Sequence, residues 1–108
     1  MALFMHQWSY KDTAMKAFVK SPQDRESAVR AAVESFGGEL VAFYFAFGVH
    51  DGVAICRFDD AQSAMAAMMA LFGQGRVKEL ITTPLLTAEE GRAAMEQAHD
   101  ALTAISRG

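Results

Sequence analysis

The stretch LVAFYFAFGVHDGVAICRF, residues 40–58, decides the fold of this chain. It consists of two apolar, β-rich runs, Leu40–Phe47 and Asp51–Phe58, joined by the short segment Gly48-Val49-His50. Two such runs separated by a few residues that include glycine predict an antiparallel hairpin. Because helical patterns lie on both sides of this hairpin in the chain, we expect the hairpin at the middle of a mixed α and β fold.

The predicted elements alternate around the hairpin. Before it we expect a first strand and then a helix that begins at Ser21-Pro22 and ends at Gly37-Gly38. After it we expect a helix capped by Asp59-Asp60, a fourth strand in which Pro84 indicates an edge, and a last helix opened by the capping box Thr87-Ala88-Glu89-Glu90. This order predicts a ferredoxin-like βαββαβ fold of the α+β class, with two helices on one face of a four-stranded antiparallel sheet and a further C-terminal helix. A different α+β sandwich of the same elements is the alternative. We expect the first strand over Leu3–Tyr10 and the fourth over Val77–Leu86.

The first strand of the hairpin is apolar on both of its faces. We predict that Leu40, Ala42, Tyr44 and Ala46 point one way and that Val41, Phe43, Phe45 and Phe47 point the other. A sheet covered by helices on one side only should alternate between apolar and polar residues. An apolar open face therefore predicts an interface. We expect the chain to form a homodimer or a higher homo-oligomer, in which two sheets enclose a barrel-like space.

The helix after the hairpin also lacks a polar outer side. Ala66, Met69 and Ala70 would face outward, so we expect either the C-terminal helix or a neighbouring subunit to cover them. Its methionines indicate an adaptable core in preference to a copper site.

Composition sets the class of protein. The 108 residues are expected to form one domain, residues 1–108, and the net charge of −3 with scattered basic residues argues against a nucleic-acid partner. The apolar segments are too short to cross a membrane, and no secretory leader is evident. The single cysteine, Cys56, allows no internal disulfide and suggests a buried strand thiol, so a reducing cytoplasm is the expected location.

The run from Gly48 to Ile55 resembles the GYD domain family, together with Asp59-Asp60, Gly75-Arg76-Val77 and the segment from Thr82 to Gly91. The resemblance extends from the first strand to about residue 98. It implies the fold of the dimeric ferredoxin-like α/β barrels, and it carries no established activity. The tyrosine that gives the family its name is replaced here by His50, and Phe58 stands where members often have proline. Asp51 is the motif position that is unchanged.

Two groups of residues are candidates for a ligand pocket. His50 and Asp51 at the hairpin turn could act as an acid and base. A structural role is favoured, in which Asp51 bonds backbone amides of its own turn and His50 packs nearby, because neighbouring strand residues point to opposite faces. His6, Trp8 and Tyr10 share one side of the first strand with Phe4, and they line either a pocket or the dimer core. The candidates are His6, Trp8, Tyr10, Tyr44, His50 and Asp51.

No catalytic residue, metal site or cofactor is indicated. The sequence has neither zinc-ligand spacing nor a phosphate-binding glycine loop. Our first hypothesis is a homo-oligomeric module that binds a small ligand or a partner through the sheet face. The alternatives are a small-molecule enzyme of the dimeric barrel type (a cofactor-independent oxygenase, an isomerase or a haem-handling protein) and a purely structural assembly protein.

Overall fold

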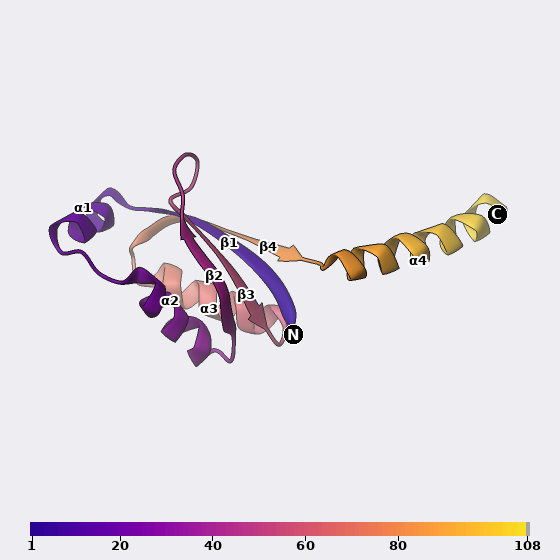
Figure 1. The fold of residues 1–108 in the computed structure, drawn as a ribbon, viewed down its shortest axis with the longest axis horizontal. Coiled ribbons are helices and arrows are strands. Elements are labelled where there is room, and N and C mark those ends of the chain that lie inside the picture. Colours follow the sequence, from indigo (N-terminus) through magenta and orange to yellow (C-terminus); the bar gives the residue numbers. More distant parts are fainter. Residues whose placement is uncertain (108) are drawn as a thin grey trace.

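The computed structural model describes residues 1–107. Its elements are β1 (Ala2–Tyr10), α1 (Asp12–Lys20), α2 (Arg25–Ser35), β2 (Glu39–Phe45), β3 (Gly52–Phe58), α3 (Ala61–Gly73), β4 (Val77–Leu85) and α4 (Ala88–Arg107). The strands form one antiparallel sheet in the order β2-β3-β1-β4, with α2 and α3 on the same face (Figure 1). The predicted ferredoxin-like α+β fold is confirmed, and α1 is a short additional helix before α2. Pro84 lies on edge strand β4, as expected for a residue that cannot donate to a ladder.

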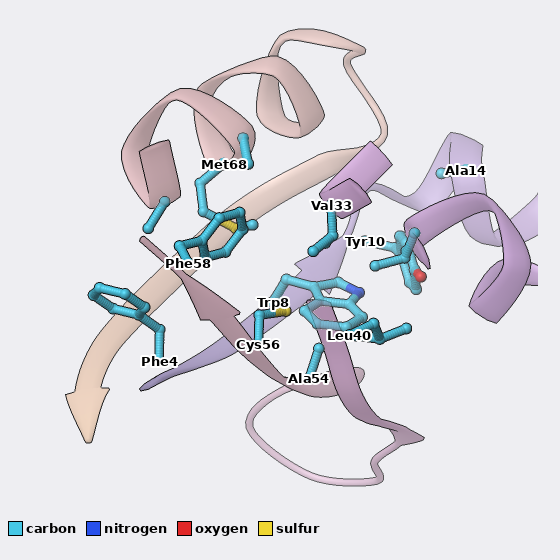
Figure 2. Close-up of a cluster of buried hydrophobic side chains, with 13 residues drawn as sticks. Phe4, Trp8, Tyr10, Ala14, Val33, Leu40, Ala54, Cys56, Phe58 and Met68 are labelled. Atoms are coloured by element: carbon cyan, nitrogen blue, oxygen red, sulfur yellow. The ribbon is translucent and has the colours of Figure 1, made fainter. Parts of the chain in front are cut away.

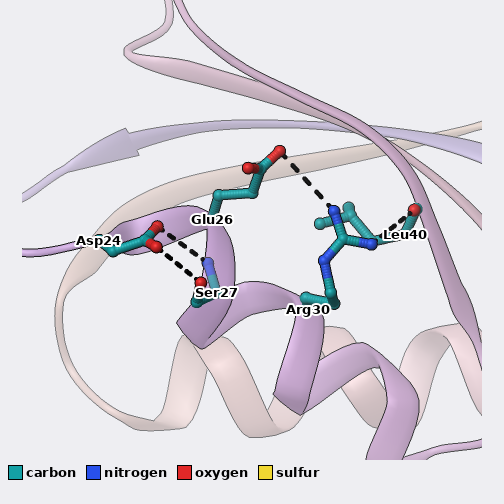
Figure 3. Close-up of polar contacts among 5 residues, drawn as sticks. All are labelled: Asp24, Glu26, Ser27, Arg30 and Leu40. Carbon is teal, nitrogen blue, oxygen red and sulfur yellow. Dashed lines mark hydrogen bonds and ion pairs between the residues drawn. The ribbon is translucent and has the colours of Figure 1, made fainter.

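Helix α2 begins three residues later than the sequence predicts. Its N-cap is Asp24, whose side chain accepts hydrogen bonds from the backbone nitrogen and the hydroxyl of Ser27 at 3.1 and 2.6 Å (Figure 3). The predicted start at Ser21-Pro22 is therefore wrong, because Asp24 supplies the capping carboxylate that satisfies the first turn. The same bonds lower the pKa of Asp24, the hydroxyl of Ser27 contributing most.

A β-bulge changes the side-chain phase of β2. Leu40 pairs with Cys56 but Ala42 pairs with Ile55, so Val41 is an extra residue in the ladder. The predicted grouping of Leu40 with Tyr44 is wrong, because two residues oppose one at the bulge and the alternation is reversed beyond it. Leu40 is buried beneath the helices, and Tyr44, which pairs with Val53, is on the opposite, open face.

The core lies between the sheet and helices α2 and α3. Figure 2 shows it built from Phe4 and Trp8 of β1 and Cys56 and Phe58 of β3, with Met68 of α3. These residues alternate along their strands with the residues of the open face, as the pleat requires.

The open face is apolar, as expected, and no helix covers it in Figure 1. Met5 and Gln7 at its centre are half-buried and are flanked by the residues that pair with them on both sides. Apolar members of this face are Leu3, Met5, Ala42, Tyr44, Val53, Ile55, Ile81 and Leu85.

Helix α4 projects away from the sheet (Figure 1), and none of its residues is buried. The chain is consequently elongated, with extents of 65 × 29 × 21 Å. The expectation that this helix covers the outer side of α3 is wrong within one chain. Met65 and Met69 of α3 remain exposed as a result.

Candidate functional site

A cavity of about 40 Å³ lies between the sheet and the two helices that cover it. That volume exceeds the space needed for one water molecule about threefold. Its floor includes His6, Trp8 and Tyr10, which share a face because they are alternate residues of β1. The other lining residues are Arg25, Val29 and Val33 of α2, Ala54 and Cys56 of β3, Met68, Leu71 and Phe72 of α3, and Gln74, Arg76, Val77 and Leu80.

His6 is the most enclosed polar residue of the cavity, with 1% of its surface exposed. Its Nδ1 shares a 2.9 Å hydrogen bond with the Thr82 hydroxyl, the partner opposite it on β4. Its Nε2 is buried and has no hydrogen-bond partner among residues 1–107. Burial lowers the pKa of His6 to about 4, so the ring is neutral at pH 7. An unpaired polar atom in an apolar cavity is a group that a bound molecule could satisfy.

Arg25 brings a positive charge to the same cavity. Its side chain is only 9% exposed, and its guanidinium stacks over the Phe18 ring at 5.1 Å. One terminal nitrogen donates to Gln23 Oε1 at 2.9 Å, whereas Nε has no partner in the described part of the chain. No carboxylate forms an ion pair with Arg25 within residues 1–107. Arginine keeps its charge when buried, so this guanidinium is an uncompensated cation.

The rest of the lining adds to the positive character. Arg76 lies beside the cavity, and its guanidinium donates to Gln74 Oε1 at 2.6 Å. The described lining residues include no aspartate or glutamate. The cavity therefore combines apolar walls, one neutral histidine and two arginines, a composition suited to a small molecule with an apolar body and a negative group.

Sequence reasoning did not identify Arg25. The available signal was its position in the first turn of a helix, where the helix dipole disfavours a cation and acidic residues are usual. The predicted helix start at Ser21-Pro22 places Arg25 three residues further into the helix, so the sequence pattern did not place it at the first helical position.

Trp8 is held in place by the motif at the hairpin end. A side chain at Gly52 would overlap the indole of Trp8, which packs directly on the glycine backbone. The indole also lies 5.6 Å from the Phe43 ring, centroid to centroid. Gly52 is thus required for the position of one wall of the cavity.

Asp51 anchors the hairpin to β1. Its Oδ2 accepts a 2.8 Å hydrogen bond from the backbone nitrogen of Tyr10, and its own backbone nitrogen donates to the carbonyl of Trp8 at 2.8 Å. These contacts fix the register of β1 against the loop before β3.

The remaining predicted site residues lie away from the cavity. Asp51, His50 and Tyr44 do not line it. The Nδ1 atom of His50 is buried and has no hydrogen-bond partner within the described chain, so it does not bond the Asp51 carboxylate. Tyr44 lies on the open face, with its side chain exposed. The structure therefore brings together His6, Trp8 and Tyr10 and separates them from the other three candidates.

Cys56 is a buried wall residue and matches the prediction of a strand thiol. Burial raises its pKa to about 11, which keeps the thiol protonated. Among residues 1–107, no three potential ligands gather as a metal site would require. No helix in the described range has the combination of length and apolar character needed to span a bilayer.

Comparisons with known proteins agree on the fold. The sequence model for the GYD domain matches residues 4–95, and no curated protein matches the chain. The protein TTHA0845 from Thermus thermophilus is similar in structure, with a TM-score of 0.55 and 16% identity, over 82% of this chain and 96% of that one. The 5-chloro-2-hydroxyhydroquinone dehydrochlorinase from Burkholderia phenoliruptrix AC1100, solved with 2,5-dihydroxybenzoquinone, has a TM-score of 0.56 and 9% identity, over 82% and 97%. At these identities the likeness concerns the fold alone.

Proposed function

We propose that this chain, which belongs to the GYD domain family, is a homodimeric binding protein for small organic anions. The family resemblance expected from residues 48–55 is confirmed by the match over residues 4–95. The family sets the fold, and the chemistry of the cavity supports the choice of ligand.

The observation that carries the proposal is that Nε of Arg25 and Nε2 of His6, two buried nitrogens without a hydrogen-bond partner in the described chain, belong to residues that line the same cavity. A buried charge without a partner is costly, and a carboxylate or phenolate would both neutralise Arg25 and accept its free N–H. If the Thr82 hydroxyl donates to Nδ1 of His6, the ring hydrogen lies on Nε2 and can donate to the same anion. The apolar walls, including Trp8 and Val33, would contact the body of the ligand.

The uncovered sheet face supports the homodimer. Its apolar residues occupy all four strands, and an exposed patch of this kind is typical of an interface. Pairing two such faces about a two-fold axis would leave each cavity on the outer, helix-covered side of its own sheet. Ligand binding and dimerisation would therefore use opposite faces.

Binding of paired probes tests the anion preference. Butyrate and benzoate are compared with butyramide and benzamide, which have similar shapes and no charge. Trp8 is the only tryptophan and lines the cavity, so its fluorescence reports binding directly. We expect the two carboxylates to bind at least tenfold more tightly than their amides, because a charged hydrogen bond contributes about 1.5–3 kcal/mol.

Variants of Arg25 identify the group responsible. Arg25→Gln should remove the preference for carboxylates, and Arg25→Lys should keep part of it because the charge remains. Arg30→Gln is the matched control: Arg30 lies on the same helix but is half-exposed, 3.8 Å from Glu26 and bonded to the Leu40 carbonyl (Figure 3). Equal binding of amides and carboxylates, or an Arg25→Gln variant that keeps the preference, would refute the proposal.

An enzymatic role is a second candidate, favoured by His6. A neutral imidazole oriented by Thr82 through one nitrogen can accept a proton at the other. Turnover of a bound anion that disappears in His6→Gln while binding persists would establish it.

A further inference from the structure

Helix α4 carries an apolar stripe that nothing in its own chain covers. Met95, Leu102 and Ile105 are between 60% and 73% exposed, and the helix projects from the end of β4 (Figure 1). With 3.6 residues per turn, these residues share one side of the helix with Ala94 and Ala98. An amphipathic helix without a partner surface is not stable by propensity alone in water, so the stripe indicates a docking partner.

The charged residues of α4 lie on the opposite side of the helix. Arg92 and Glu96 are joined by a 3.1 Å ion pair, and His99 and Asp100 lie on the same polar side. The side formed by Ala94, Ala98 and the three large residues carries no charge. Its alanines would allow a close approach to another surface.

A groove between α3 and β4 provides a surface of matching character. The groove has a volume of about 610 Å³ and is open to solvent along the side of α3. Met65 and Met69 are 62% and 66% exposed. With Phe72 they form one row along the side of α3, because the three are spaced four and three residues apart. Thr82 is the only polar side chain of its lining among the described residues, which are Phe4, Ala61, Ala64, Met65, Met68, Met69, Phe72, Gly73, Leu80, Thr82 and Pro84.

The groove and the stripe also agree in length. Helix α3 has 13 residues and is therefore about 20 Å long. The stripe from Ala94 to Ile105 spans about 17 Å at the same rise. Flexible methionine side chains adapt well to a docked helix, and recognition of this kind uses anchors at intervals of three, four and seven residues.

We propose that α4 of one subunit docks in the α3–β4 groove of a second copy of this chain, and that the exchange is reciprocal. The inference rests on the homodimer of the proposed function and is independent of the ligand. It explains why both apolar surfaces are uncovered in a single chain: each is the complement of the other in the partner.

The area involved suits a contact that reinforces a dimer. A large apolar side chain buries on the order of 100 Å², so three on the helix and three in the groove give about 600 Å² for each docked helix. Two symmetric dockings give about 1,200 Å², the lower limit for a stable interface. The exchanged helices would therefore reinforce subunits that already pair through their sheets.

Photo-crosslinking tests which subunit holds α4. A benzophenone maleimide is attached to Met69→Cys in the full chain, where the native Cys56 is fully buried and protected from labelling. Chains grown in ¹⁴N and ¹⁵N media are mixed by unfolding and refolding together, irradiated and digested. We expect light scattering to report a dimer. Among the crosslinked pairs of an α3 peptide and an α4 peptide, we expect pairs in which one peptide carries ¹⁴N and the other ¹⁵N. A dimer whose α4 crosslinks all lie within one chain, or that gives no α4 crosslinks, would overturn the exchange.

Two point variants test the stripe itself. Leu102→Glu should raise the dimer dissociation constant about tenfold or more, because the charge replaces a buried leucine in two symmetric contacts. Thr103→Glu, about 100° around the helix and on its polar side, should change the dissociation constant less than twofold. Equal effects of the two variants would contradict the proposal. Butyrate titration of the wild-type dimer, compared with the Met69→Cys crosslinks, separates the two proposals: isotope-mixed crosslinks without carboxylate binding would refute only the ligand, and carboxylate binding without such crosslinks would refute only the exchange.

Discussion

His6 makes the stability of this protein depend on pH in a way that can be calculated. The residue is 1% exposed, its ring packs against the Phe4 and Phe58 rings with centroids 6.3 Å from each, and it is neutral in the folded chain. Burial lowers its pKa from 6.5 to about 4. In the unfolded chain the same ring takes up a proton at pH 6.5, so acidification favours the unfolded state.

The size of the effect follows from the pKa difference. Between pH 6.5 and 4 the unfolded state binds more protons than the folded state, so the free energy of unfolding rises with pH in this window and is lost as the pH falls through it. With 1.36 kcal/mol per pKa unit, the full effect for His6 is about 3 kcal/mol. Between pH 7 and pH 4.5 the loss is about 2 kcal/mol.

Urea unfolding of the wild type and of His6→Gln at pH 7 and pH 4.5 measures this contribution. Any carboxylate whose pKa changes on folding contributes equally in both proteins, so its effect cancels in the difference. We expect His6→Gln to lose about 2 kcal/mol less than the wild type on acidification. Equal losses would show that His6 is not a buried neutral ring and would refute the reasoning. An NMR titration of the His6 ring gives an independent value.

Two further changes test the packing and the caps. Gly52→Ala should destabilise the fold by about 1–3 kcal/mol in urea unfolding, because the new methyl group overlaps the Trp8 indole; Gly91→Ala, which meets no atom, is the control and should not destabilise it. Asp24→Ala should lower the free energy of unfolding by about 1 kcal/mol, whereas Ser21→Ala should leave it within about 0.5 kcal/mol. If either control variant lost more free energy of unfolding than the variant it is compared with, the corresponding contact would be contradicted.

The position of Arg25 illustrates what local sequence patterns miss. Ser21-Pro22 and Asp24 are both good capping signals only a few residues apart, and local preference does not choose between them. The bonds from Asp24 to Ser27 decide the start of α2. That start places Arg25 in the first turn, against the Phe18 ring and the cavity.

The sequence predicts that His6, Trp8 and Tyr10 share one face of β1. It does not predict whether that face points toward the helices or away from them. Alternation along β1 places the three on one side with Phe4, and the structure agrees. Both sides of this strand carry large apolar residues, so the pattern did not say which one the helices cover. Figures 1 and 2 show the helices over the side of Trp8, which makes it the wall of a cavity within one chain instead of the dimer core.

The sequence by itself determined the order of the elements, the hairpin at residues 40–58 and the apolar character of the open face, because these depend on residue type and short-range periodicity. Tertiary structure alone decided the bulge at Val41, the presence of Arg25 and His6 in the lining of one cavity, and the projection of α4 from the sheet. The first two depend on contacts between residues far apart in the chain, and the third on the lack of such contacts along α4. Strand register and helix docking are set by such contacts, and no local pattern encodes them.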